Sequence, residues 1–301
     1  MVSIFLQITV SLVYILSGLL KLQDPVGTGL IVEAYFRFMH LNDFMELAKS
    51  FGAMLGFVET TIGLLVFFCI WQKVSRWLLV AMQSVFTVIS LVLLIQSPEM
   101  HCGCFGEAIH LTHLQTFMKN IILMGMVLYV CFSDSVSRRT EVWRYYAFGA
   151  SIVLVVGLAL YSWFNLPFMD FTDYDKGTKL LSQTEYRILS DSEKEDCMPL
   201  PMLRPNDTFI PDFSQGKWAV ISVYEQMDCQ KLTKSHTELI RQGMNVMILI
   251  TTDISVNNID LKGYENNIFL TDRTTALSLN RANSGVTLLY DGVITNKTIL
   301  R

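Results

Sequence analysis

The chain has 301 residues, of which 51% are hydrophobic and 17% are charged, and its mean hydropathy is +0.40. This composition is more apolar than that of an ordinary soluble domain and indicates a membrane protein. The net charge of -4 gives no basic surface, so we expect no nucleic-acid partner. The six cysteines are too few for a disulfide scaffold.

Five apolar runs are long enough to cross about 30 Å of hydrocarbon, which takes roughly 20 helical residues. They cover residues 2–20, 52–70, 77–95, 114–132 and 145–164. We interpret the first run as a retained helix rather than a signal peptide, because no basic segment precedes it. Cys69 and Cys131 lie inside these runs and are interpreted as small buried hydrophobes.

The segment 21–50 is too polar to span a membrane and too long to be a tight turn. Its apolar residues approximate helical spacing, which predicts an amphipathic helix along the outer membrane interface. We interpret this helix as a cover over the mouth of the bundle.

Glu59 lies inside the second apolar run, where a carboxylate is energetically unfavourable without a partner or a proton. Lys21 is a candidate partner if the first two spans pack side by side, and Gln83 in the third span is another. Glu59 is therefore a candidate for proton handling, or alternatively a polar clamp that fixes helix pairing.

The loop between the third and fourth spans contains Cys102-Gly103-Cys104-Phe105-Gly106. The glycine between the two cysteines permits the sharp bend that a small disulfide ring needs, and a strained ring is easily reduced. We therefore interpret Cys102 and Cys104 as a redox pair. A permanent structural bridge is the plainer alternative.

The same loop also allows a metal site. Its sulfur and imidazole groups, which zinc or copper would accept, are His101, Cys102, Cys104, His110 and His113. The two cysteines are closer in sequence than is usual for structural zinc, so we favour redox chemistry and no metal.

The distribution of positive charge predicts the orientation of the spans. Lysine and arginine flank two loops, at Lys73 and Arg76 and at Arg138, Arg139 and Arg144. These loops should be cytoplasmic, whereas the loop 97–113 has neither residue type and should lie on the other side. The prediction is a multi-pass protein with a cytoplasmic N-terminus and with the cysteine pair outside, where disulfides persist.

Three features together resemble the MauE branch of the DoxX-like membrane proteins over about residues 1–135. They are Ser17-Gly18-Leu19-Leu20-Lys21-Leu22-Gln23-Asp24-Pro25, Glu59, and the Cys102 to Gly106 loop. The resemblance implies a four-helix bundle in a bacterial inner membrane, distantly similar to vitamin K epoxide reductase and DsbB. It also implies a role in maturing a disulfide-rich periplasmic protein, and the DsbB analogy implies a quinone near Glu59 as a possible cofactor.

The C-terminal part departs from this resemblance. After a fifth span in 136–169 and a polar linker over 170–205, which we expect to be mostly extended or irregular, residues 206–301 predict a β-α-β-α-β-β order. This order resembles thioredoxin-like domains. Cys229 stands near the usual redox position without a Cys-x-x-Cys partner, so the domain is either a docking module or uses a distant thiol such as Cys197.

We therefore expect an α-helical membrane bundle with an extracytoplasmic α/β thioredoxin-like domain. The expected function is thiol-disulfide exchange on exported or periplasmic client proteins through Cys102 and Cys104. The alternative is a non-enzymatic assembly, chaperone or lipid-binding scaffold, whose bundle contacts membrane lipids and whose C-terminal domain is a docking surface.

Overall fold

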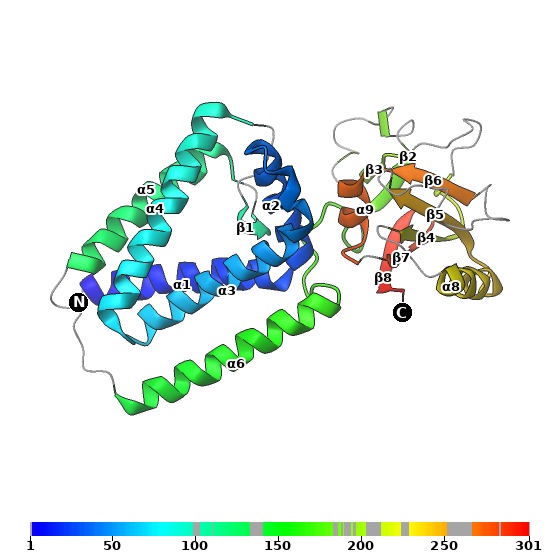
Figure 1. The fold of residues 1–301 in the computed structure, drawn as a ribbon. Helices are drawn as coiled ribbons and strands as arrows, with labels where there is room; N and C mark the ends of the chain where they lie inside the picture. The colour runs from blue at the N-terminus through cyan, green and yellow to red at the C-terminus, as the bar shows by residue number, and fades with distance from the viewer. Residues whose placement is uncertain are drawn as a thin grey trace. The chain divides into compact units, whose positions relative to one another are not determined.

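A computed structural model places the chain in two compact units, Met1–Phe164 and Asn165–Arg301. The first unit is helical and the second is built on a sheet (Figure 1). The structure describes residues 2–98, 103–109, 111–132, 141–182, 186–187, 189, 194, 197–202, 212–223, 229–251, 267–282 and 284–300.

Five described helices of the first unit are long and apolar enough to span a membrane. They are α1 (Val2–Gln23), α3 (Ala48–Phe67), α4 (Gln72–Gln96), α5 (His113–Phe132) and α6 (Val142–Phe164). The five predicted spans are confirmed as helices of this kind. The largest differences are at the starts of α4, at Gln72 rather than 77, and of α3, at Ala48 rather than 52.

Helices α1 and α3 lie side by side because glycines remove side chains from their contact (Figure 1). A Cβ on Gly18 of α1 would lie 2.7 Å from the backbone nitrogen of Thr60 and would also meet the carbonyl oxygen of Gly56. A Cβ on Gly56 would lie 2.9 Å from the carbonyl oxygen of Gly18. The two backbones therefore approach as closely as small-residue contacts allow in membrane helices.

The polar segment after α1 forms α2 (Pro25–Phe38) and the 3₁₀ helix η1 (Asn42–Leu47). Asp24 caps α2 by accepting a 2.8 Å hydrogen bond from the Gly27 backbone nitrogen, and Pro25 occupies the first turn. The helix predicted in 21–50 is confirmed, and its Thr28 packs against Gly52 of α3. The short strand β1 (Cys104–Glu107) contacts both α1 and α2.

Helices α4 and α5 are held together by buried polar groups as well as by apolar packing. Gln83 of α4 donates a 3.1 Å hydrogen bond to the carbonyl oxygen of Asn120 in α5. The Asn120 amide in turn donates a 3.2 Å bond to the carbonyl oxygen of Phe86. Such reciprocal bonds fix the register between two membrane helices.

The second unit contains a seven-stranded sheet in the order β3-β2-β8-β7-β4-β5-β6. Its elements are β2 (Lys179–Ser182), β3 (Cys197–Leu200), β4 (Lys217–Val223), α8 (Cys229–Arg241), β5 (Asn245–Thr251), β6 (Ile268–Thr271), α9 (Arg273–Leu279), β7 (Ser284–Tyr290) and β8 (Val293–Ile299). Strands β4, β5 and β6 are parallel, whereas β7 is antiparallel to both β4 and β8. The Asp291-Gly292 turn joins β7 to β8 with both residues at positive φ, as a two-residue hairpin turn requires.

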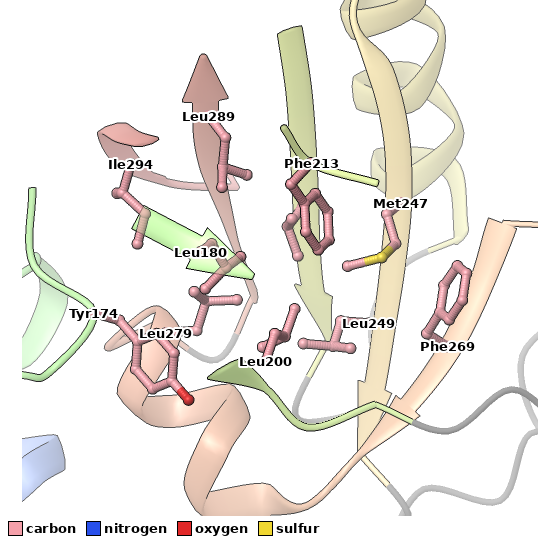
Figure 2. Packing of buried hydrophobic residues seen from close by; sticks show 11 residues of the cluster. Tyr174, Leu180, Leu200, Phe213, Met247, Leu249, Phe269, Leu279, Leu289 and Ile294 are labelled. Atoms are coloured by element: carbon pink, nitrogen blue, oxygen red, sulfur yellow. The ribbon is translucent and has the colours of Figure 1, made fainter. Parts of the chain in front are cut away.

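Alternating side chains of the central strands form two apolar layers. Met247 and Leu249 of β5 face one layer, shown in Figure 2, together with Phe213. Ile248 and Ile250 face the other layer, on which α8 lies through Leu232. Every second residue thus points to the same face, and both faces of the sheet are covered.

The segment 170–205 was predicted to be mostly extended or irregular, and its pairing into the sheet was not predicted. It contributes the strands β2 and β3 to the sheet, with Leu180 and Leu200 fully buried (Figure 2). Asp170 forms an ion pair with Lys297 of β8 at 2.5 Å. The two strands are four residues each, too short to show a hydrophobic period in a polar sequence.

Candidate functional site

A buried ion pair joins α1 to α3. The Nζ atom of Lys21 lies 2.9 Å from Oε2 of Glu59, and the two side chains are 4% and 1% exposed. The close glycine contact between α1 and α3 brings the two residues together, although they are 38 positions apart in the sequence. A pair buried this deeply is stable only while both partners remain, because either charge alone would be uncompensated.

All three protons of the Lys21 ammonium have acceptors. Besides Glu59, Nζ lies 2.8 Å from Oγ of Ser17 and 2.6 Å from the backbone carbonyl oxygen of Cys104. Ser17 precedes Lys21 by one helical turn, so both side chains project from the same face of α1. The ammonium group therefore fixes the backbone of the cysteine loop against the membrane helices.

Ser17 adds a second connection between the same groups. Its hydroxyl lies 2.8 Å from Oε2 of Glu59 and 2.6 Å from the carbonyl oxygen of Cys104. A hydroxyl carries one proton, so Ser17 donates to one of these two acceptors at a time while it accepts from Lys21. The Cys104 carbonyl oxygen and the Glu59 carboxylate thus share two donors, the Lys21 ammonium and the Ser17 hydroxyl.

The loop conformation depends on two glycines in the left-handed region. Gly103 has φ +64° and Gly106 has φ +61°, and the Gly106 backbone nitrogen donates a 3.1 Å hydrogen bond to the Gly103 carbonyl oxygen. A Cβ on Gly103 would also lie 2.9 Å from Cδ1 of Ile31 in α2. Glycine is therefore required at 103 both by backbone conformation and by space.

A cavity of about 400 Å³ lies beside this network. Its lining residues are Val13, Tyr14, Ser17, Lys21, Thr28, Ile31, Val32, Tyr35, Phe36, Met39, Phe51, Met54, Leu55, Val58, Glu59, Met82, Gln83, Phe86, Ile89, Gly103, Cys104, Phe105, Lys119, Asn120 and Leu123. Most of them are apolar or aromatic, and they come from α1 to α5 and from the cysteine loop. An apolar cavity of this size with a few convergent polar groups is typical of a small-molecule site.

The structure brings two of the sequence-predicted residues together and separates a third from them. Lys21 and Glu59 are in contact, and Cys104 is partly buried at the cavity wall. Gln83, considered as a partner of Glu59, instead accepts a 2.9 Å hydrogen bond from the Tyr14 hydroxyl and donates to Asn120. Cys102 lies outside the described residues, so the geometry of the cysteine pair stays a prediction.

The candidate metal ligands are only partly described. His101, Cys102 and His110 lie outside the described residues, while Nε2 of His113 lies 3.0 Å from the carbonyl oxygen of Pro98. Within the described parts of the chain, no group of three or more histidine, cysteine, aspartate or glutamate side chains could hold a metal ion.

The secondary thiols lie in the sheet-containing unit. Cys197 begins β3 and is partly buried, and Cys229 begins α8, although the placement of its side chain is not described.

Sequence reasoning missed two parts of the site. Ser17 was part of the motif but had no assigned role, although its spacing of four residues from Lys21 places both on one helix face. The cavity itself was not foreseen, because it is lined by residues from six separate segments. No local sequence pattern predicts such a cavity.

Comparison with protein families matches residues 1–133 to the family described as methylamine utilisation protein MauE. The match covers α1 to α5 and the cysteine loop, and it ends before α6 and the sheet-containing unit. This finding supports the resemblance drawn from the sequence for the helical membrane region. Curated proteins and solved structures gave no match.

Proposed function

From this MauE-like membrane region, we propose that the protein performs thiol-disulfide exchange at Cys102 and Cys104 on exported client proteins. The observation that carries the proposal is the attachment of the Cys104 backbone to the buried Lys21 ammonium at 2.6 Å. This attachment holds one cysteine of the pair at the wall of an apolar cavity, beside a buried carboxylate. Intramembrane ionisable groups of this kind are uncommon and usually serve a function.

The exchange balances without another reactant. The Cys102 thiolate attacks one sulfur of a client disulfide, so that a Cys102–client bond forms and the other client sulfur leaves as a thiolate. The Cys104 thiolate then attacks the Cys102 sulfur, which forms the Cys102–Cys104 bond and releases the second client sulfur as a thiolate. The client gains the two electrons that the pair loses, and the reverse sequence oxidises a client.

Lys21 and Ser17 act as positioning residues in this proposal, through their hydrogen bonds to the backbone carbonyl oxygen of Cys104. Glu59 holds Lys21 in place through Oε2 and presents its other oxygen, Oε1, as a proton acceptor at the cavity wall. Glycine at 103, in the left-handed region, permits the sharp backbone bend that a small disulfide ring between residues 102 and 104 needs.

We infer further that the sheet-containing unit is a thioredoxin-like docking module. In its support, the chain order is β4, α8, β5, β6, α9, β7 and β8, which adds the strand β6 to the predicted order. Strand β4 pairs in parallel with β5 and antiparallel with β7. Cys229 begins the helix after β4, where a redox pair would stand, but Leu232 occupies the fourth position of that helix. A single cysteine suits recognition of a client better than exchange.

The orientation of the protein completes the proposal. With the positively charged loops in the cytoplasm, the Cys102 and Cys104 loop and the sheet-containing unit both lie on the extracytoplasmic side. Exported proteins acquire their disulfides in that compartment.

Thiol trapping in cells tests this function. A maleimide that adds a known mass to each free thiol should show the Cys102 and Cys104 pair in both oxidised and reduced forms in the full-length protein. Cys104→Ser should leave Cys102 attached to clients, as adducts that a reductant releases. The matched control is Cys131→Ser in α5, which should leave the pair exchanging and accumulate no adduct. A pair locked in one state, with no adduct in Cys104→Ser, would favour the scaffold alternative.

A further inference from the structure

One oxygen of the buried Glu59 carboxylate has no hydrogen-bond partner among the residues that the structure describes. Oε2 is bonded to Lys21 and Ser17, whereas Oε1 is buried without a donor within reach. Glu59 is 1% exposed and lines the cavity. A buried charged oxygen that lacks a donor is destabilising, because it has lost the water that would otherwise solvate it.

The other polar groups around the cavity do not compete for this position. Tyr14 donates to Gln83, and Gln83 donates to Asn120, whose own amide is bonded to the Phe86 carbonyl. Among the cavity-lining residues that the structure describes, Glu59 Oε1 is the buried side-chain atom without a partner. The described wall of the cavity therefore presents one buried acceptor that lacks a donor.

The composition of the wall limits what can bind there. The volume of about 400 Å³ falls in the range of small-molecule sites, and Ile31, Phe36, Met54 and Ile89 are typical of its lining. The Lys21 charge is already matched by Glu59, and the ammonium of Lys119, the remaining charged residue of the described wall, lies 4.6 Å from the centroid of the Phe105 ring. Because the rest of the wall is mostly apolar, a neutral and largely apolar occupant fits the cavity best.

We propose that this cavity binds a neutral apolar molecule carrying a hydroxyl group, which donates a hydrogen bond to Glu59 Oε1. An ionised carboxylate only accepts hydrogen bonds, so the site selects a donor and disfavours a molecule whose oxygens are all carbonyls or ethers. Two membrane-soluble sources have this chemistry, namely alkyl hydroquinones and lipid alcohols such as diacylglycerol. The oxidised quinone lacks the donor, so it should bind more weakly than the hydroquinone.

The binding test uses the unsubstituted full-length protein in lipid nanodiscs. A decyl benzohydroquinone and dioctanoylglycerol are each compared, by equilibrium dialysis, with the matching compound whose hydroxyl groups are methylated. The free hydroxyl form should bind about tenfold or more tightly, because a hydrogen bond to a charged group is lost on methylation. Whichever of the two molecules binds more tightly identifies the source. Equal binding of free and methylated forms, or binding of neither molecule, overturns the proposal.

A pair of variants on α4 locates the ligand. Ile89→Trp fills the cavity, whereas Val88→Trp adds the same group at a neighbouring position that is 60% exposed and does not line it. Ile89→Trp should lower affinity for the hydroxyl compound at least tenfold, and Val88→Trp should leave it unchanged. Unchanged affinity in Ile89→Trp would place the ligand elsewhere and refute the proposal.

Binding at Glu59 can be separated from the thiol chemistry. Cys102→Ser alone removes one thiol of the pair and abolishes exchange, but it leaves Cys104, Glu59 and the other cavity-lining residues unchanged, so binding of the hydroxyl compound should persist. A failure of exchange and a failure of binding can therefore be told apart.

Discussion

Lys21 and Cys104, which are 83 positions apart, are joined by a 2.6 Å hydrogen bond from the lysine ammonium to the cysteine carbonyl oxygen. The same ammonium neutralises Glu59 of α3. One side chain thus connects two membrane helices with the loop that carries the cysteines. A change at Lys21 should affect both helix packing and the loop.

We predict that Lys21→Met lowers the free energy of unfolding of the helical unit by about 3–5 kcal/mol, because Glu59 is left buried and unpaired. The freed loop should also make Cys104 react faster with maleimide. Both effects are measured on the full chain in detergent, by thermal unfolding and by labelling rate. Lys73→Met, at an exposed position of α4, is the control and should change neither quantity. Equal effects of the two variants would contradict the role given to Lys21.

The double variant Lys21→Met with Glu59→Leu should be more stable than either single variant. Removing both charges leaves no uncompensated ion in the bundle, and apolar side chains of similar size can replace a buried pair at little cost. A double-mutant cycle on thermal unfolding measures this coupling. Additive losses would show that Lys21 and Glu59 act independently. Maleimide labelling of Cys104 should stay fast in the double variant, because its carbonyl has lost the Lys21 donor.

Gly18→Ala should destabilise the helical unit, because the added Cβ would meet the backbone of Gly56 and Thr60 across the α1–α3 contact. Overpacking of a close contact typically costs about 1–3 kcal/mol. Gly125→Ala is the matched control in α5, where a Cβ meets nothing within 4 Å and alanine favours the helix. Thermal unfolding should show a loss for the first variant only. A neutral Gly18→Ala would mean that α1 and α3 separate easily.

The membrane helices were predictable from sequence because each carries its own signal. An apolar run of roughly 20 residues must form a helix in lipid, whatever its neighbours are. The contact between Lys21 and Glu59 was suggested for a similar reason, since an intramembrane charge needs an opposite one nearby. Ile31 and Ile89, in contrast, line one cavity although nothing in their local sequences relates them.

The sheet also contains elements that local sequence does not predict. The strands β4, β5, β7 and β8 each have seven residues and could be recognised from their apolar runs and from the Asp-Gly turn. The four-residue strands β2 and β3 could not, because they lie in a polar segment and depend on pairing with distant strands. Their strand conformation comes from the assembled sheet and not from local propensity.

Tyr174 attaches the beginning of the second unit to β3, because its hydroxyl donates a 2.9 Å hydrogen bond to the Pro199 carbonyl oxygen. Burial raises the pKa of Tyr174 from 10.0 to about 12, and the negative charges of Asp173 and Asp272 add to the shift. The folded state therefore holds the phenol proton more tightly than the unfolded state does. This stabilisation is fully present below pH 10 and is lost as the pH rises toward 12.

We predict that Tyr174→Phe lowers the unfolding free energy of the second unit by about 1 kcal/mol at neutral pH, through loss of the hydrogen bond. Above pH 10 the unsubstituted protein loses the stabilisation due to the Tyr174 hydroxyl, which the Tyr174→Phe variant lacks at every pH. The difference in unfolding free energy between the two proteins should therefore shrink. Urea unfolding of the full chain, followed by circular dichroism at neutral pH and near pH 11, measures both values. Tyr290→Phe, at a side chain that is 54% exposed, should show no such change with pH. A difference for Tyr174→Phe that stays constant with pH would mean that its hydroxyl titrates alike in the folded and unfolded states.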